Sequence, residues 1–212
     1  MYLFTRSVRF APGHLADSMA WAVGMADRVN TGTDLDVRLF SRVFSPGLGT
    51  VAFATFVEGL QALHDANDAL MGDAGYLAAV DEGAAFIDSN PDDALLQIVH
   101  GAPDPSRAVT YVSTVRTVIA NGMIQRGVDV GVQISQHAEK VTGVPTLFGV
   151  SMSGPYGSVG WTTGYESVQH FQDAEGALTT DPEWLALLDG EAATAYADSA
   201  FASEQLVWRL VG

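Results

Sequence analysis

The chain of 212 residues contains no cysteine. It therefore has no disulfides, no thiolate ligands for a metal and no cysteine nucleophile. Lysine is almost as scarce, because Lys140 is the only one and arginine carries the rest of the positive charge. The formal net charge is −15, and each half of the chain has more acids than bases. We therefore expect no nucleic-acid partner, since phosphate backbones and anionic membrane surfaces would repel such a chain.

Long hydrophobic runs are missing as well. The longest apolar stretches have the length of a strand, whereas a transmembrane helix needs about 20 apolar residues. The first residues, MYLFTRSVRF, lack the basic region, apolar stretch and small-residue cleavage site of a signal peptide. We predict no membrane partner and a cytoplasmic location. Hydrophobic residues still make up 48% of the chain, which is enough for a large core and argues against disorder.

An internal repeat is the strongest feature that the sequence does contain. Residues 49–81, GTVAFATFVEGLQALHDANDALMGDAGYLAAVD, match residues 157–189, GSVGWTTGYESVQHFQDAEGALTTDPEWLALLD, at 13 of 33 positions without a gap. The two stretches lie 108 positions apart. We infer a duplication of one small domain. The predicted organisation is a first repeat over 1–101, a linker over 102–107 and a second repeat over 108–212.

Both repeats show the same succession of hydrophobic patterns. Alternating apolar residues predict strands, and apolar residues three and four apart predict helices. In the first repeat the predicted strands are 2–10, 35–45, 50–58 and 93–100, and the predicted helices are 14–30, 59–71 and 74–87. In the second repeat the predicted strands are 109–118, 145–153, 157–166 and 204–211, and the predicted helices are 121–141, 167–178 and 183–198.

The βαββαβ order predicts one antiparallel four-stranded sheet per repeat, with its helices on one face. The strand over 50–58 is apolar on both faces, with Val51, Phe53 and Val57 on one and Ala52, Ala54 and Phe56 on the other. A sheet that is apolar on both faces is covered on both faces. The predicted fold class is therefore α+β: two tandem ferredoxin-like repeats whose sheets pack face to face into an intramolecular eight-stranded α/β barrel.

One junction between a strand and a helix carries a family resemblance. The sequence there has an aromatic residue, Glu and Ser, with a second aromatic residue four positions after the Ser: Tyr165, Glu166, Ser167 and Phe171. The first repeat keeps this spacing more loosely, as Val57, Glu58, Gly59 and Leu63. Together with the βαββαβ order, this resembles the dimeric α/β-barrel superfamily, which includes antibiotic-biosynthesis monooxygenase-like domains. Two chains usually close the barrel in that superfamily, so the resemblance implies that this chain corresponds to one whole dimer.

The resemblance implies several activities: cofactor-free oxygenation of polycyclic phenols, haem degradation and muconolactone-type isomerisation. It also implies that a flat organic ligand lies between a sheet and its helices. The haem-degrading members have an Asn on the first strand and a Trp and a His on the second helical region. The corresponding positions here hold Arg6-Ser7, Ser113-Thr114, Ala66 and Ala174. We therefore predict no cofactor, and haem binding is kept as an alternative.

Four residues are candidate catalytic groups: Arg6, His64, His170 and Tyr165. Arg6 interrupts an apolar row, where a guanidinium could hold a carboxylate or enolate. The alternative for Arg6 is an ion pair with a helix acid such as Asp17 or Asp65. Each of the two histidines could be a general base, or a half-exposed residue at a helix edge. Tyr165 has a hydroxyl that needs a partner if the side chain is buried.

Four aromatic residues are candidate ligand-binding groups: Tyr111, Trp161, Phe4 and Phe53. The alternative is that these strand residues only fill the core. The second repeat is the better pocket candidate, because a phenol and an indole suit a flat ligand. Gly24 and Gly131 fall at matching places inside the first helix of each repeat, where they allow either a close helix–sheet approach or room for a ligand. No histidines are spaced as metal ligands, so no metal site is predicted.

These observations favour a small-molecule enzyme or binding protein that resembles cofactor-independent monooxygenases acting on flat aromatic substrates. The expected partner is a small hydrophobic or aromatic ligand. The alternative is a non-catalytic ligand sensor or a self-assembling structural protein, because no polar candidate is repeated between the two copies. A homo-oligomer is compatible with either hypothesis.

Overall fold

The computed structural model describes residues 1–197 and 203–211. They form two compact units. Unit 1 consists of Met1–Leu95 with the C-terminal residues from Arg209 onward, and unit 2 consists of Leu96–Trp208. Strands β4 (Asp92–His100) and β8 (Glu204–Val211) each continue from one unit into the other. The repeat boundaries at 101 and 108 concern the duplication in the sequence and stay a prediction.

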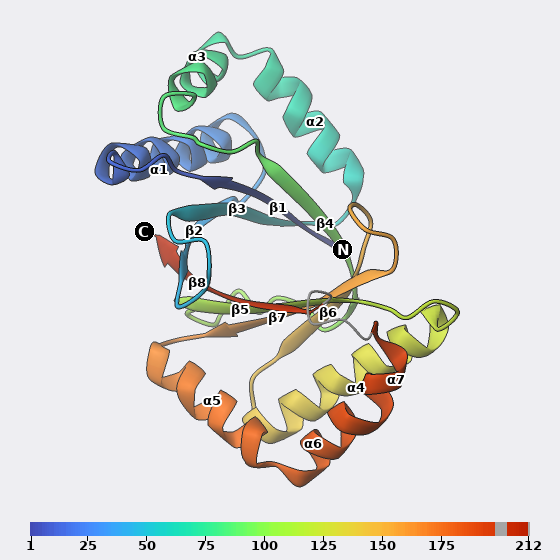
Figure 1. The fold of residues 1–212 in the computed structure, drawn as a ribbon. Helices are drawn as coiled ribbons and strands as arrows, with labels where there is room; N and C mark the ends of the chain where they lie inside the picture. Colours follow the sequence, from blue (N-terminus) through green and yellow to red (C-terminus); the bar gives the residue numbers. More distant parts are fainter. Residues whose placement is uncertain (198–202, 212) are drawn as a thin grey trace. The chain divides into compact units, whose positions relative to one another are not determined.

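Unit 1 is built on three adjacent antiparallel strands. β3 (Thr50–Val57) lies between β1 (Tyr2–Arg9) and β2 (Arg38–Val43). Helices α1 (Leu15–Gly32), α2 (Leu60–Met71) and α3 (Ala74–Gly83) lie on one side of these strands (Figure 1). The buried core between strands and helices consists of Val8, Phe10, Ala22, Ala26, Leu39 and Val51.

Unit 2 repeats this plan with more helical segments. β7 (Ser158–Tyr165) lies between β5 (Tyr111–Val118) and β6 (Thr146–Ser151), and β6 also pairs with the second half of β4. The helical segments are α4 (Ile124–Thr142), α5 (Val168–Thr180), α6 (Pro182–Leu187), the π-helical turn Leu188–Ala192 and α7 (Ala193–Ala195). The main core cluster consists of Ile119, Val130, Ile134, Phe148, Val159, Trp161, Ala192 and Ala195.

The eight strands follow the order β1-β3-β2-β8-β5-β7-β6-β4, and this order closes into a barrel. The α+β fold with an eight-stranded barrel, predicted from the duplication and from the apolar strands, is therefore confirmed. Every strand has two neighbours in this order, so closure removes the exposed edges that an open sheet would present.

Two predicted helices are shorter or less regular than expected. The helix predicted over 74–87 ends at Gly83, after which Ile87 forms a β-bridge with Phe10. The helix predicted over 183–198 is divided into α6, the π-helical turn and α7, and its last predicted residue lies outside the described residues. Apolar spacing alone misses both endings, because each depends on tertiary contacts.

Gly131 allows a close approach between α4 and the sheet. A Cβ atom at this position would lie 2.1 Å from Cζ of Phe148, whose side chain is fully buried. A Cβ atom at Gly24 of α1 would have no other atom within 4 Å. The first helical hydrogen bond of α1 runs from the backbone N–H of Ser18 to the carbonyl oxygen of His14, and that of α4 runs from Gly127 to Met123. Ser18 therefore corresponds to Gly127. The counterpart of Gly131 is therefore Ala22, and the predicted equivalence of Gly24 and Gly131 is wrong.

The strand–helix junction that carries the family resemblance begins α5 with a side-chain cap. The backbone N–H of His170 donates to Oγ of Ser167 over 3.1 Å. A serine oxygen in this position satisfies one of the free N–H groups of the first helical turn. Gly59 takes the same place before α2 and gives no side-chain cap.

Among the described helices, none combines the length and apolar character needed to cross a bilayer.

Candidate functional site

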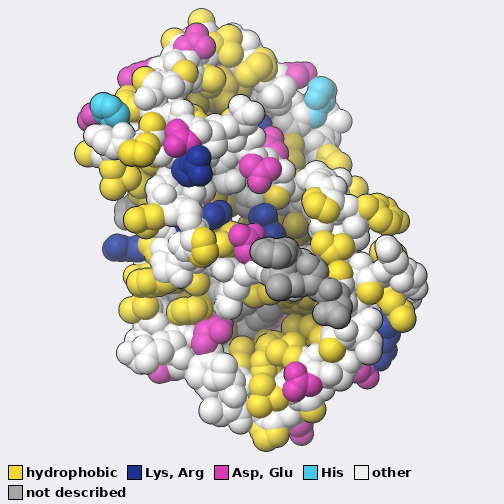
Figure 2. Space-filling view, viewed as in Figure 1, with side chains coloured by type: hydrophobic (Ala, Val, Ile, Leu, Met, Phe, Trp, Pro, Cys, Tyr) yellow, Lys and Arg dark blue, Asp and Glu magenta, His cyan; other side chains and the backbone are white. Residues whose placement is uncertain are grey.

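Unit 2 contains a pocket of about 680 Å³ between its sheet and its helices. Figure 2 shows hydrophobic side chains gathered in the gap between α5 and α6. The sheet side of the pocket is formed by Ser113, Val115, Thr117, Thr146, Trp161, Thr163, Tyr165 and Gln205. The helix side includes Ile134, Ala138, Thr142, Glu175, Leu178, Thr179, Trp184, Leu188 and Ala192. The volume is in the range of small-molecule sites.

A row of hydroxyl groups crosses the sheet side of the pocket. Thr163 is the register partner of Ser113 on β5 and of Thr146 on β6, so the three side chains share one face. The hydroxyl oxygens of Thr146 and Thr163 are 3.1 Å apart. On the far side of Ser113, Nε2 of Gln205 donates to the Ser113 hydroxyl over 3.3 Å. The row gives this wall several groups that can orient a polar ligand.

Glu175 is the one charged side chain among the described residues of the pocket lining. Burial raises the pKa of its carboxyl group, and a hydrogen bond from Gln205 opposes this rise. That bond is long, with 3.5 Å between Nε2 of Gln205 and Oε1 of Glu175. The carboxylate is therefore only weakly satisfied by the protein, and it can accept a hydrogen bond from a ligand.

Tyr165 lies at the same end of the pocket as Glu175. Its side chain is 3% exposed and makes edge-on contacts with the rings of His170 and Phe171. Burial raises the pKa of Tyr165, the nearby charge of Glu175 raises it further, and a hydrogen bond with Thr163 opposes both effects. The phenol is therefore neutral at physiological pH and remains a hydrogen-bonding group.

Aromatic rings form the other end of the pocket. Nε1 of Trp161 donates to the carbonyl oxygen of Gly131 over 3.0 Å, and the edge of the Tyr196 ring meets Trp161 at 5.6 Å between centroids. The hydroxyl of Tyr196 donates to the carbonyl oxygen of Gly127 over 2.8 Å. Because the polar atoms of both rings bind helix carbonyls, the rings present mainly their apolar surfaces to a ligand.

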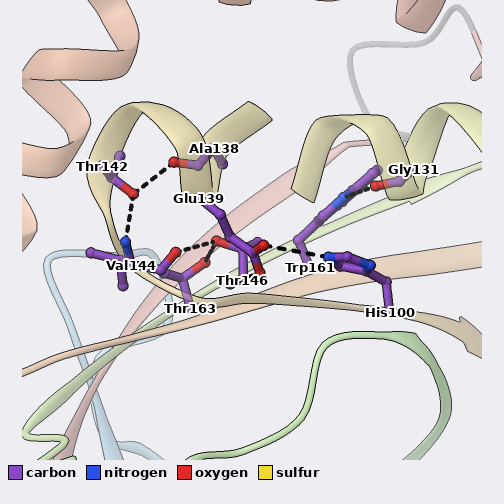
Figure 3. A network of polar contacts seen from close by, with 9 residues as sticks. All are labelled: His100, Gly131, Ala138, Glu139, Thr142, Val144, Thr146, Trp161 and Thr163. Carbon is purple, nitrogen blue, oxygen red and sulfur yellow. Dashed lines mark hydrogen bonds and ion pairs between the residues drawn. The ribbon is translucent and has the colours of Figure 1, made fainter. Parts of the chain in front are cut away.

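A second polar chain continues from the hydroxyl row (Figure 3). The backbone N–H of Thr146 donates to Oε1 of Glu139 over 3.0 Å. The other oxygen of Glu139 lies 3.6 Å from Nε2 of His100, which is buried without a hydrogen-bond partner. These contacts tie β4 and α4 to β6, so they hold the hydroxyl row in place from outside the pocket.

The helix that carries Trp184 is held by His137 and Asp181. Nε2 of His137 lies 2.9 Å from Oδ1 of Asp181, and the same oxygen accepts the backbone N–H of Trp184 at the start of α6. The His137 hydrogen bond is the main cause that lowers the pKa of Asp181, followed by the Trp184 bond. The ring of His137 also stacks on Trp184, so this pair positions a pocket wall.

Comparison with known proteins gives similarity in structure but not in sequence. No protein-family model and no curated protein matches the sequence. A candidate monooxygenase from Fusobacterium nucleatum has a TM-score of 0.72 at 6% identity, covering 100% of this chain and 92% of its own. An anthrone oxidase-like protein has a TM-score of 0.65 at 12% identity, covering 100% and 91%. A candidate monooxygenase from Lactobacillus acidophilus has a TM-score of 0.63 at 9% identity, covering 99% and 92%.

The chain has the dimeric α/β-barrel fold. The neighbours match 99–100% of this chain, and its eight strands close into a barrel. The recognition made from the βαββαβ order and the Tyr165 junction is therefore confirmed at the level of the fold. Identities of this size say nothing further about activity.

Two of the predicted site residues of this α/β barrel, Trp161 and Tyr165, line the pocket in unit 2. Tyr111 is the register partner of Tyr165 and packs beside it, next to Phe171, without being among the described lining residues. His170 contacts the Tyr165 ring from the start of α5. Tyr111 and His170 therefore lie behind Tyr165, outside the described lining. The catalytic roles predicted for Tyr165 and His170 and the ligand-binding roles predicted for Trp161 and Tyr111 stay predictions.

The other predicted residues of the α/β barrel lie in unit 1. Nε and Nη2 of Arg6 bind the two carboxylate oxygens of Asp93 at 2.8 and 2.7 Å, so the ion pair uses a strand acid instead of Asp17 or Asp65. The guanidinium also lies 5.8 Å from the ring centre of Phe4. Phe53 packs against the unit 1 core. The roles predicted for these residues stay predictions.

His64 is the most exposed of the predicted catalytic residues. Its side chain is 64% exposed and lies 3.6 Å from Asp68, one helical turn further along α2. This placement agrees with the alternative of a helix-edge residue. A smaller recess of about 420 Å³ in unit 1, between the end of α1 and α2, is lined by Asp65 but not by His64.

Glu175 and Gln205 were missed by the sequence analysis. A signal for Glu175 was available, because it lies four residues after Phe171 and three before Leu178, which places an acid on the apolar side of α5. Gln205 gave no such signal, since its position depends on how β8 pairs with its neighbours.

The described residues around the pocket do not fit haem. The lining includes no histidine or methionine, and the chain has no cysteine. The tyrosine at the aromatic end, Tyr196, already donates its hydroxyl proton to the carbonyl oxygen of Gly127. Elsewhere, no group of three or more metal-ligating side chains occurs within the described part of the chain.

Proposed function

We propose that the protein binds a flat aromatic small molecule in the unit 2 pocket and promotes its oxygenation without a metal or a flavin. One observation carries the proposal: the pocket has aromatic rings at one end, a hydroxyl row across its floor and one carboxylate at the other end. The fold shared with candidate monooxygenases and with an anthrone oxidase-like protein supports this choice of reaction class.

In the proposed reaction the ligand supplies the electrons and dissolved dioxygen is the oxidant. An electron-rich CH₂ group becomes C=O, and the second oxygen atom leaves as water together with the two hydrogens, so the atoms balance. The protein residues bind and orient the ring. Trp161 and Tyr196 contact it with their apolar surfaces, Thr163 and Ser113 can donate to its oxygen, and Glu175 accepts a hydrogen bond from it. Such positioning lowers the entropic cost of the reaction.

The experiment combines binding and turnover. Purified protein is incubated with a panel of fused-ring phenols in air-saturated buffer, and oxygen uptake is followed together with product mass. We expect uptake of one dioxygen per product that has gained one oxygen atom and lost two hydrogens. Glu175→Gln should lower kcat/KM, whereas Asp173→Asn, on the exposed face of the same helix, should not. The proposal fails if no compound of the panel reacts.

Ligand sensing without turnover is the second candidate, and a specific difference between the units favours it. The hydroxyl row of unit 2 is not repeated in unit 1, where Phe4 and Thr55 pair at the positions of Ser113 and Thr163. A duplicated enzyme would be expected to keep its polar groups in both copies. Tight binding with no oxygen uptake across the panel would select the sensor.

Self-association is compatible with both the enzyme and the sensor, and the exposed tips of two β-hairpins favour it. Each unit exposes large apolar side chains at its β-hairpin tip: Leu48 is 82% exposed in unit 1 and Tyr156 is 91% exposed in unit 2. Exposed apolar groups of this kind often contact a partner. The solution mass, compared with that of a Leu48→Ser and Tyr156→Ser double variant, tests whether a homo-oligomer forms through the tips.

A further inference from the structure

The described lining of the unit 2 pocket carries negative charge without a positive partner. Among the described lining residues, Glu175 is charged and no arginine, lysine or histidine accompanies it. Its contact within the pocket is the 3.5 Å hydrogen bond from Gln205, and a neutral amide at that distance compensates a half-buried carboxylate poorly. A cation in the pocket would compensate it better than any group that the lining provides.

The carboxylate end and the aromatic end are separated along one strand. Tyr165 belongs to one buried cluster with Ala174, the residue before Glu175, and lies four residues after Trp161 on the same face of β7. Four residues of a strand span ~13 Å. An occupant that reaches both ends therefore has an elongated shape, with an aromatic group beside Trp161 and Tyr196 and a polar head near Glu175.

We propose that the natural ligand of this pocket is an elongated organic cation, with an aromatic ring at one end and a protonated amine that binds Glu175 at the other. The inference rests on the proposed function, in that it specifies the ligand of the same pocket. An ammonium N–H group donating to a carboxylate makes a charge-assisted hydrogen bond, which is stronger than one from a neutral hydroxyl.

Two further features favour a cation over an anion. The ring of Tyr165, at the carboxylate end, attracts positive charge to its face. The chain as a whole carries a formal net charge of −15, which raises the local concentration of cations and lowers that of anions. A carboxylate or phosphate ligand would instead bring a second negative charge next to Glu175, with no arginine or lysine among the described lining residues to hold it.

The test uses three probes that differ in the head group: 2-(2-naphthyl)ethylamine, 2-(2-naphthyl)ethanol and 3-(2-naphthyl)propanoic acid. Their affinities are measured by titration calorimetry on the full chain. We expect the amine to bind about tenfold or more tightly than the alcohol, since an ionic hydrogen bond adds at least that factor. The acid should show no measurable binding.

Two charge-matched variants separate the local effect of Glu175 from the general acidity of the protein. Glu175→Gln should lower the affinity for the amine by about tenfold and change the affinity for the alcohol by less than about twofold. Asp173→Asn removes the same charge from the exposed face of α5, where Asp173 accepts a hydrogen bond from Gln169, and should change neither affinity. An equal loss in both variants would assign the preference to overall charge and would overturn the inference.

The ranking of the probes on the unmodified protein also separates this inference from the function beneath it. If the alcohol binds as well as the amine, or the acid binds best, the inference is wrong while the ligand pocket stands. If no probe binds, the proposed ligand pocket itself is refuted. Because this ranking needs no variant, it holds even if Glu175→Gln fails to fold.

Discussion

Thr55 and Thr163 occupy the same place in the two units, but their hydroxyl groups have different surroundings. In unit 2, Thr163 meets the hydroxyl of Thr146. In unit 1, Thr55 is 3% exposed and its Oγ1 is buried without a partner. The pairing of Leu39 with Phe53 matches that of Phe148 with Trp161, and continuing this register puts Val37 where unit 2 has Thr146. The two units share one scaffold, while the hydroxyl row that could serve a ligand occurs in unit 2.

The largest difference between the units should appear at the helix glycines. Gly131→Ala forces a Cβ to within 2.1 Å of the buried Phe148 ring, and we expect a loss of about 2 kcal/mol or more in the free energy of unfolding through overpacking. Gly24→Ala meets no atom within 4 Å and should raise stability by up to about 1 kcal/mol through helix propensity. Urea unfolding of both variants measures the difference, and equal effects would contradict it.

Removing the two hydroxyls should have opposite effects. Thr163→Val deletes a hydrogen bond and leaves Thr146 without that partner, so we expect a loss of about 1 kcal/mol in unfolding free energy. Thr55→Val deletes a buried hydroxyl that has no partner, so stability should stay equal or rise. Thermal unfolding of both variants under one set of conditions is sufficient. A similar loss in both would mean that Thr55 has a hydrogen bond in solution.

The caps of α2 and α5 give a smaller contrast. Ser167→Ala removes the side-chain cap of α5 and should reduce stability by roughly 0.5–1 kcal/mol. Gly59→Ser would supply the missing cap of α2 and should raise stability by a few tenths of a kcal/mol. Chemical denaturation of the two variants provides the comparison. A stability gain from Ser167→Ala would show that the observed cap contributes nothing.

Asp181 should give the smallest effect, a stabilising contribution that is present at neutral pH and lost in acid. Its pKa is lowered in the folded chain, first by His137. A carboxyl group with a lowered folded pKa stabilises the fold above its unfolded pKa, and that contribution is lost as the pH falls through the folded value, which means below about pH 4. Asp181→Asn should therefore flatten the acid limb of the stability curve. An unchanged acid limb would refute a stabilising role for the pair.

The architecture could be predicted from the sequence because it rests on repeated local patterns. The duplication gave two units with the same element order, and a strand apolar on both faces implied a barrel. Ser167 could be read as a helix start from its neighbours alone. Tyr165 and Trp161 were found because they are a phenol and an indole on a predicted strand, and both suit a flat ligand.

The rest of the site depends on long-range placement. Gln205 reaches the pocket only because β8 pairs beside β5, and no local pattern contains that information. Arg6 was a reasonable candidate on an apolar row, but its partner Asp93 is 87 residues away, which spacing within one strand cannot reveal. Glu175 is an intermediate case. Its position on the apolar side of α5 could be predicted from the sequence, whereas its long hydrogen bond from Gln205 could not.

Strands β4 and β8 each belong partly to both units, and this limits how the chain can be divided. A fragment that stops after residue 101 would lack β8, the strand that lies beside β2 in the closed order. Its β2 would then present a free row of backbone N–H and C=O groups, which invites pairing with another molecule. Separate expression of the first repeat should therefore yield a protein that self-associates. In the intact chain, β8 supplies this strand pairing within one molecule.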